Sequence, residues 1–362
     1  MKAFVTGGSG FIGQRIVRQL IERGDTVYAL ARSERSAGIL SELGAYIVPG
    51  DITDIDSMRS GMQGCDVVFH VAAWYKIGAL SHSEAEAVNV VGTRRILRLA
   101  IELEIPKIIY TSSIVVFGDT RGQLVDETYL SGGPFLTEYD RTKWLAHYKV
   151  ARPLIEKGAP IVIVMPGLVF GRGDQSVLSD MMRLFYRGLP VLAGPETIVT
   201  YSHVDDIAEG HILAAEMGRI GESYILAGPA ISLGDMIDFW GHLTGRPTPL
   251  FRIPASLLKP FVPLLDFVKG FIPIPSLFSA ESVTMLGTTY IASSEKAKQE
   301  LGWQTRPLQS QMLDTLNWIA EEEESRAESP VGRQQRWAMA ALFAGLVFLI
   351  WWLLGRKAKS EK

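Results

Sequence analysis

The 362-residue sequence predicts an α/β protein, a doubly wound parallel sheet that carries a smaller C-terminal subdomain. Two observations predict this class. Short apolar runs alternate with amphipathic stretches of helical period, which is the pattern of parallel strands joined by crossover helices. The first apolar run leads directly into a glycine-rich turn, as at the first strand–helix junction of a dinucleotide-binding sheet.

The glycine-rich turn has the sequence Thr-Gly-Gly-Ser-Gly-Phe-Ile-Gly and occupies residues 6–13. It follows the apolar run at residues 3–5, and apolar residues recur at helical spacing after it. In such a turn Gly7 allows the tight bend, Gly10 lets the backbone approach a pyrophosphate, and Gly13 lets the helix pack against the strand. The pyrophosphate then binds free N–H groups at the helix N-terminus. The turn therefore predicts a Rossmann dinucleotide site rather than a plain helix cap.

The rest of the chain continues this alternation and then becomes irregular. Further strands are expected at residues 26–30, 45–48, 66–71, 107–110 and 161–165. Helices are expected at residues 11–21, 33–43, 54–62, 84–103 and 138–156. Residues 1–165 then form the dinucleotide-binding core. Residues 166–320, with many Pro and Gly, form a substrate subdomain interleaved with returns to the sheet.

Composition excludes several classes of function. A net charge of −3 gives no basis for nucleic-acid binding. Six scattered histidines show no metal-ligand spacing, so no metal site is expected. The single cysteine, Cys65, rules out an internal disulfide, which fits a reducing compartment, and it is expected to be a small buried side chain.

The C-terminus predicts a membrane anchor. A polar linker at 321–336 precedes an uncharged apolar run at 337–354, and a basic tail follows at 355–362. The run is about 18 residues long, at the lower end of the roughly 17–25 that cross a bilayer. A buried core helix is the alternative, which the preceding linker disfavours. We expect a single span with the catalytic domain facing the cytoplasm, although the basic tail by itself favours a cytoplasmic tail.

A second apolar stretch, residues 255–278, is interrupted by Lys259, Asp266, Lys269 and several prolines. These charges make a membrane span implausible. The stretch is expected to be a packed lid over a pocket, or a membrane-facing lid through which an apolar substrate enters.

Three residues suggest proton-transfer chemistry. Tyr139 and Lys143 are spaced i, i+4 on a predicted helix and therefore share a face. An ammonium beside a phenol lowers the phenol pKa, so Tyr139 is expected to exchange a proton with a substrate oxygen. Ser113 follows the strand at 107–110, where it would face the ligand crevice and hydrogen-bond the same oxygen.

Together with the glycine turn, these residues resemble the extended short-chain dehydrogenase/reductases of the NAD-dependent epimerase/dehydratase superfamily, over about residues 1–320. Further matching motifs lie at residues 50–54, 70–73, 89–93, 139–143, 201–208 and 301–303. The resemblance implies that Ser113, Tyr139 and Lys143 form the catalytic set and that Asn89 braces the active-site helix through water or backbone. It also implies a homodimer paired through the helices at 84–103 and 138–156.

The same resemblance, with the glycine turn, implies where the cofactor lies. Asp51 and Ile52 flank the adenine, Ala72 lies along the cofactor, Lys143 also holds the nicotinamide ribose, and residues 166–169 lie against the nicotinamide. The residues expected to contact the cofactor are Gly7, Gly10, Phe11, Ile12, Gly13, Arg32, Ser33, Asp51, Ile52, Ala72, Ala73, Thr111, Tyr139, Lys143, Pro166, Gly167 and Val169.

The end of the second strand favours NADP over NAD. No acid stands there to accept the ribose hydroxyls of NAD before Glu34. Arg32 is expected to pair with the 2′-phosphate of NADP, and Ser33 to donate to it. The alternative is that Arg32 stacks on the adenine and NAD is used.

Departures from the family pattern bear on the substrate. Ile114 and Val115 stand where the resemblance places the Asp–Glu pair of dehydratases. Residues 197–200 and Met165 offer no arginine where sugar-nucleotide enzymes clamp a diphosphate. The arginines left open as substitutes are Arg172, Arg183 and Arg187.

Apolar side chains are expected to line the substrate pocket instead, about half of them being ordinary core. They are Trp74, Tyr75, Ile77, Leu80, Phe117, Phe135 and residues 168–170. This resembles the dihydroflavonol reductase and 3β-hydroxysteroid dehydrogenase branch, and it predicts hydride transfer with a lipophilic alcohol or ketone that is steroid-, terpenoid- or flavonol-like. Two alternatives stay open: a membrane-tethered nucleotide-sugar epimerase, and a non-catalytic cofactor-sensing scaffold or assembly factor at a membrane.

Overall fold

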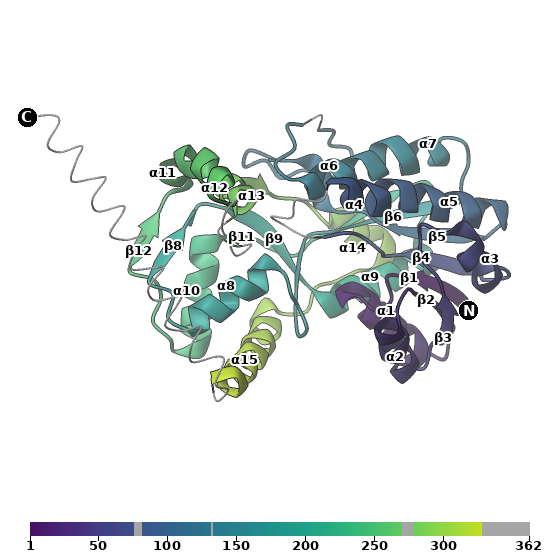
Figure 1. Cartoon of the computed structure of the whole chain (residues 1–362), viewed down its shortest axis with the longest axis horizontal. Coiled ribbons are helices and arrows are strands. Elements are labelled where there is room, and N and C mark those ends of the chain that lie inside the picture. The colour runs from purple at the N-terminus through teal and green to yellow at the C-terminus, as the bar shows by residue number, and fades with distance from the viewer. Residues whose placement is uncertain (76–81, 132, 270–276, 278, 328–362) are drawn as a thin grey trace, which may run out of the picture.

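The computed structural model describes residues 1–75, 82–131, 133–269, 277 and 279–327. Its centre is a seven-stranded sheet in the order β10-β6-β5-β4-β1-β2-β3, and every neighbouring pair is parallel (Figure 1). The strands are β1 (Lys2–Thr6), β2 (Thr26–Ala31), β3 (Tyr46–Pro49), β4 (Val67–His70), β5 (Lys107–Thr111), β6 (Ile161–Pro166) and β10 (Ser223–Leu226). The predicted doubly wound sheet is confirmed, and β10 is a seventh strand that the sequence did not single out.

Helices cover both faces of this sheet because strand side chains alternate between two apolar cores. Phe4 and Val68 face one core, whereas Val5 and Phe69 face the other. The first core is closed by α3 (Ile55–Met62) and by the helices labelled α4 to α7 in Figure 1. The second is closed by α1 (Phe11–Glu22), α2 (Glu34–Glu42), α9 (Val204–Met217) and α14 (Glu295–Leu301).

The two long helices predicted at 84–103 and 138–156 are continuous, but each contains a π-helical segment. The first consists of α4 (His82–Glu86), a π-segment (Ala87–Gly92) and α5 (Thr93–Glu102). The second consists of α6 (Glu138–Trp144), a π-segment (Leu145–Ala151) and α7 (Arg152–Ile155). Such widened turns occur mainly at functional sites, and apolar periodicity does not predict them.

The subdomain is built around a second sheet of order β11-β9-β13, and β7 also pairs with β9. Its strands are β7 (Leu168–Phe170), β9 (Ile198–His203), β11 (Ala230–Ser232) and β13 (Thr289–Tyr290), and a separate pair joins β8 (Val191–Ala193) to β12 (Phe251–Ile253). A third apolar core lies among α8 (Val177–Tyr186), α10 (Leu233–Thr244) and α15 (Leu308–Ala327). Because α9, β10 and α14 pack on or join the first sheet, segments of residues 166–320 alternate between the subdomain and the first sheet.

The end of the described chain differs from the prediction. Residues 321–327, assigned to the polar linker, continue α15. They are held there by ion pairs to α8, with Arg183 Nη2 3.0 Å from Glu322 and Arg187 Nε 2.6 Å from Glu323. None of the helices in the described ranges is long and apolar enough to cross a bilayer. The predicted span at 337–354 and the basic tail lie outside those ranges.

Candidate active site

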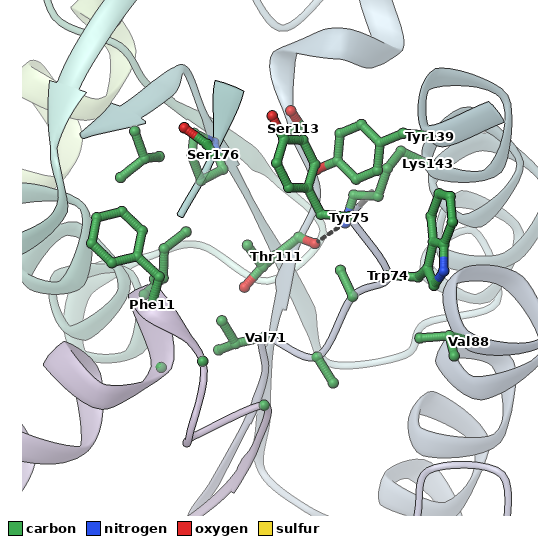
Figure 2. Close-up of a pocket in the computed structure, with 18 of the residues that line it drawn as sticks. Phe11, Val71, Trp74, Tyr75, Val88, Thr111, Ser113, Tyr139, Lys143 and Ser176 are labelled. Carbon is green, nitrogen blue, oxygen red and sulfur yellow. Dashed lines mark hydrogen bonds between the residues drawn. The ribbon is translucent and has the colours of Figure 1, made fainter. Parts of the chain in front are cut away.

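A cavity of about 800 Å³ runs along the carboxyl ends of the strands, from the glycine turn to the subdomain. It lies across β1 and β4, where the strand order reverses, which is where doubly wound sheets bind ligands. Figure 2 shows the cavity with Phe11 and Val71 on one side and Tyr75, Ser113, Tyr139 and Lys143 gathered on another.

The glycine turn has the geometry of an anion cradle. Gly7 has φ +73°, and a Cβ there would lie 2.5 Å from the Ala72 nitrogen. A Cβ on Gly13 would lie 2.0 Å from the Gly7 carbonyl oxygen, so only glycine fits at that position. No side chain caps α1 at Gly10, which leaves the N–H groups of its first turn directed at the cavity. These residues fit the pyrophosphate of a dinucleotide.

The adenine end contains some of the predicted residues. Arg32, Asp51 and Ile52 line the cavity. Burial raises the pKa of the Asp51 carboxyl, but hydrogen bonds from Thr53 and the charge of Arg32 outweigh it and hold the pKa below its usual value.

Ser33, by contrast, does not line the cavity. It is the N-cap of α2, where its hydroxyl accepts a hydrogen bond from the Ser36 nitrogen at 3.2 Å, and Ser36 lies on the cavity wall instead. The capping bond uses a lone pair of this hydroxyl and leaves its proton to donate, so the contact of Ser33 with a 2′-phosphate stays a prediction.

The predicted catalytic residues lie on one wall (Figure 2). Ser113 follows β5, and Tyr139 and Lys143 come from α6, whose N-cap is Thr137. Tyr139 packs edge-on against Tyr75, with ring centroids 5.0 Å apart. The cavity thus brings a hydroxyl, a phenol and an amine from two separate elements to one place.

The predicted acidification of the phenol is wrong for this structure. Burial raises the pKa of Tyr139 above its usual value, and the hydrogen bond from Ser113 opposes this only in part. Lys143 Nζ donates instead to the Thr111 carbonyl oxygen at 2.7 Å, the dashed line in Figure 2. Burial also lowers the pKa of Lys143 to about 7. Desolvation therefore outweighs the attraction that the i, i+4 spacing suggested.

Three buried histidines surround the lysine, and the sequence did not single them out. Burial, together with the charge of Lys143, lowers the pKa of His70 and His147 to about 3 and of His211 to about 4. All three are therefore neutral at pH 7. Each is tied to a hydroxyl: His70 to Thr6 at 2.8 Å, His147 to Ser112 at 2.8 Å and His211 to Thr111 at 2.9 Å. They fix the strand ends without adding positive charge.

The Asn89 side chain hydrogen-bonds directly, without a bridging water, to the segment after β4 and to α6. Its Oδ1 accepts from the Trp74 nitrogen at 2.7 Å, and its Nδ2 donates to the Trp74 carbonyl oxygen and to the Thr142 hydroxyl at 3.1 and 2.9 Å. The π-segment that contains Asn89 turns this side chain between the segment after β4 and α6. Asn89 does not itself line the cavity, so its place is behind the wall that carries Tyr139.

The other predicted cavity residues divide into two groups. Those on the wall are Gly7, Gly10, Phe11, Ile12, Gly13, Ala72, Ala73, Trp74, Tyr75, Thr111, Pro166, Gly167, Leu168 and Val169. Phe117 and Phe170 are instead buried in apolar cores, and Phe135 packs against Trp144 on the surface. Ile77 and Leu80 lie outside the described residues. The main residues that sequence analysis missed are Glu84, Val88, Asp140, Asp174, Met285 and Tyr290.

A parallel sheet with a glycine cradle at its switch point, and a serine, a tyrosine and a lysine on the facing wall, define a nicotinamide-dependent oxidoreductase of the Rossmann class. The chain belongs to the NAD dependent epimerase/dehydratase family, whose sequence model matches residues 3–227. It is an NAD(P)-dependent dehydrogenase/reductase of the extended short-chain type.

Similar proteins cover most of the chain. A "putative dihydroflavonol 4-reductase" of Synechocystis is 32% identical over 87% of this chain and 94% of its own length. A 4-hydroxy-2-methyl-3-oxo-4-farnesyl-3,4-dihydroquinoline-1-oxide ketoreductase of Stigmatella aurantiaca is also 32% identical, over 87% and 96%. The crystal structure of gox2253 superposes with a TM-score of 0.77 at 33% identity, covering 88% of this chain and 98% of that one.

Proposed function

We propose that the protein is an NADPH-dependent oxidoreductase that interconverts a lipophilic ketone and its alcohol, of steroid-, terpenoid- or flavonol-like chemistry. The observation that carries this is the mainly apolar lining of the cavity beyond Tyr139, which we take as the substrate half. Trp74, Tyr75, Leu168 and Met285 line it, and no diphosphate clamp is found among the described residues there. A quinolone ketoreductase and a sterol demethylase protein among the relatives support a lipophilic substrate.

In this proposal the bound nicotinamide supplies the hydride that reduces the substrate carbonyl carbon. The Tyr139 hydroxyl gives its proton to the carbonyl oxygen, and Ser113 donates a hydrogen bond to that oxygen. Lys143, fixed on the Thr111 carbonyl, lies behind the phenol to hold the nicotinamide ribose. Asn89 positions this helix through Thr142.

Charge in the cavity supports a neutral substrate. Its only cations among the described residues are Arg32, at the adenine end, and Lys143. Glu84, Asp140 and Asp174 line the substrate half, so a phosphorylated ligand would meet acids there instead of a clamp.

The three arginines left open as diphosphate ligands pair with acids elsewhere. Arg172 contacts Asp314 and Glu321, and Arg183 and Arg187 contact the following glutamates of α15. This disfavours the nucleotide-sugar epimerase alternative.

The preference for NADPH rests on Arg32. It lines the adenine end of the cavity beside Asp51 and Ser36, and β2 ends at Ala31 without an acid. A guanidinium there suits a 2′-phosphate, whereas NAD binding favours a carboxylate at the same place.

A substrate panel tests the proposal. The full-length protein would be incubated with NADPH and, in turn, a 3-oxosteroid, a dihydroflavonol, a terpenoid ketone and UDP-glucose, while NADPH absorbance is followed. We expect NADPH consumption with at least one lipophilic ketone and none with UDP-glucose. Epimerisation of UDP-glucose without net cofactor turnover, and no reaction with the ketones, would support the epimerase instead.

We further propose that the catalytic domain faces the cytoplasm and lies on a membrane, anchored by the apolar run at 337–354. Large apolar side chains are exposed in and just before the stretch expected to form a lid: Leu250, Phe251, Leu257, Phe261 and Leu264. Leu250 and Phe251 lie at the start of β12, and the other three lie on α11 (Ala255–Leu258), on the turn that follows it and on α12 (Val262–Lys269). The last of these helices packs against α13 (Ala280–Met285), whose Met285 lines the cavity. A surface of this kind suits entry of a substrate from lipid.

Membrane fractionation of the full chain and of a chain ending at residue 327 tests this anchor. We expect only the full chain to resist alkaline extraction, and retention of the shortened chain at the same level would contradict the anchor. Sedimentation of the shortened chain also tests the homodimer that the family resemblance implies: we expect twice the mass of one chain, and the mass of a single chain would contradict it.

A further inference from the structure

The loop at residues 171–176 lies where the glycine turn and the subdomain meet at the cavity. It leads from β7 to α8, and three of its residues line the cavity: Asp174, Gln175 and Ser176. Residues 9–11, of the glycine turn and the start of α1, line the same cavity. Figure 2 shows Ser176 and Phe11 on the side of the cavity away from Trp74. A dinucleotide held by the glycine turn is therefore enclosed in part by this loop.

One arginine of α1 holds the loop against the helix that follows the glycine turn. Arg15 lies one helical turn after Phe11. Its Nη2 donates to the Arg172 carbonyl oxygen at 2.7 Å, and its Nε lies 3.0 Å from the Asp205 carboxylate in the first turn of α9. The pair with Asp205 fixes the plane of the guanidinium, so that the contact with Arg172 is a charge-assisted hydrogen bond of defined direction.

The chain can bend on both sides of Arg172. Gly171 and Gly173 flank it with φ of +146° and +89°, a region that glycine occupies without strain. Beyond Gly173 the chain is tied to α8, because the Asp174 carboxylate accepts from the Ser176 nitrogen and hydroxyl, both at 2.8 Å. Arg172 is therefore the part of the loop whose position depends on contacts from other elements.

The Arg172 side chain makes a second set of contacts, with α15. Its guanidinium lies 3.6 Å from the Asp314 carboxylate and 3.3 Å from that of Glu321. All three side chains are about half exposed or more, so these ion pairs contribute little. The Arg15 side chain is only 18% exposed. Its hydrogen bond is therefore the stronger contact, and it joins the loop to the cofactor-binding core.

We propose that Arg15 is a positioning residue that fastens residues 171–176 against α1 and thereby sets how long a bound dinucleotide stays in the cavity. This goes beyond the proposed function, because it requires only that a dinucleotide binds at the glycine turn. It holds equally for NADPH and NADH, since Arg15 lies away from the adenine end marked by Arg32. Release of the used cofactor is part of every turnover, so the contact also bears on kcat.

The release rate of NADPH from the full-length protein tests this. The complex would be mixed with excess NADP⁺ in a stopped-flow instrument while the fluorescence of bound NADPH is followed, with NADH and NAD⁺ used if they bind more tightly. In Arg15→Gln we expect release to be about five- to tenfold faster, because one charge-assisted hydrogen bond is lost. Arg15→Lys keeps the charge but not the planar pair of contacts, and should release at an intermediate rate.

Arg18→Gln is the matched control, because Arg18 is an exposed arginine of the same helix that makes no ion pair with any described residue. Its release rate should equal that of wild type. Amide hydrogen exchange of the cofactor-free proteins gives a second measurement. Residues 171–176 should exchange several-fold faster in Arg15→Gln than in Arg18→Gln, whereas the glycine turn at residues 6–13 should exchange equally in both.

Equal release rates in Arg15→Gln and Arg18→Gln would overturn the proposal. Faster release from an Arg15→Gln protein whose loop exchanges as slowly as in the control would also overturn it, because Arg15 would then act through another contact. Faster release and faster loop exchange in a protein that reduces none of the ketones would leave the role of Arg15 intact and count only against the proposed substrate class.

Discussion

The two halves of the cavity are assembled in different ways. The cofactor half comes from one turn and from neighbouring strand ends of a single sheet. Within that turn Gly13 lies so close to the Gly7 carbonyl that a Cβ on it would clash. The substrate half combines segments far apart in the chain, and Asp140 and Tyr290, which meet there, are 150 residues apart. A cofactor site built within a turn can be read from local sequence, whereas a substrate site built between domains cannot.

The largest effect is expected where the two halves meet. Tyr139→Phe removes the proton donor while keeping the ring that packs against Tyr75. We expect kcat to fall by roughly 10²–10⁴-fold, the usual contribution of a general acid. The dissociation constant for NADPH and the melting temperature should stay at wild-type values. A variant that keeps more than a tenth of wild-type turnover would contradict the role of the phenol.

Gly13→Ala should break the cofactor half alone. The new methyl group would lie 2.0 Å from the Gly7 carbonyl oxygen, so the turn must open. We expect NADPH to bind about 100-fold more weakly, a loss of roughly 2.7 kcal/mol in binding free energy. Fluorescence titration with NADPH measures this. Gly38→Ala, in α2 with open space around its Cβ position, is the matched control and should bind normally. Equal binding in both variants would mean that the turn does not hold the pyrophosphate.

Arg32→Ser tests, within the cofactor half, whether Arg32 binds the 2′-phosphate that distinguishes NADPH from NADH. Removing one charge-assisted contact to the 2′-phosphate should weaken NADPH binding about 10–30-fold, corresponding to roughly 1.5–2 kcal/mol. NADH binding should not change, because NADH lacks that phosphate. Isothermal titration with both cofactors measures the ratio. Equal losses for the two cofactors would instead favour stacking of Arg32 on the adenine.

A last expected effect, spread over several pH units, is a pH dependence of stability that comes from three buried histidines beneath the cavity, in β4, in the π-segment after α6 and in α9. His70, His147 and His211 have folded-state pKa values of about 3, 3 and 4, below the ordinary value of 6.5. At pH values between the folded-state pKa and 6.5, the unfolded chain binds more protons than the folded one. The free energy of unfolding therefore rises with pH in this window and falls as the pH is lowered.

We expect each histidine to lower the free energy of unfolding by up to about 1.4 kcal/mol per pH unit below pH 6. Urea unfolding between pH 4 and pH 7 measures the slope. His147→Gln, which keeps a side-chain amide near Ser112, should reduce that slope relative to wild type. His242→Gln, on α10 of the subdomain, is the control and should leave it unchanged. An equal slope in wild type and His147→Gln would contradict a buried, neutral His147.

Local sequence predicted the features that depend on short spacings. The glycine turn, the strands of the sheet up to β6 and the placing of Ser113, Tyr139 and Lys143 on one wall follow from apolar periodicity and from an i, i+4 pair. The π-segments that aim Asn89 and His147 were not predicted, because one extra residue in a helical turn leaves the apolar pattern almost unchanged.

Sequence by itself determined the fold class, the family and the chemistry-bearing side chains, because each depends on neighbours within one or two elements. Tertiary structure decided how those side chains behave. It gave Lys143 the Thr111 carbonyl as a partner, tied Arg187 to Glu323, 136 residues away, and buried the Asp140 carboxylate beside the Tyr290 hydroxyl. Burial and long-range partners control pKa and binding, and neither exists until distant segments pack together.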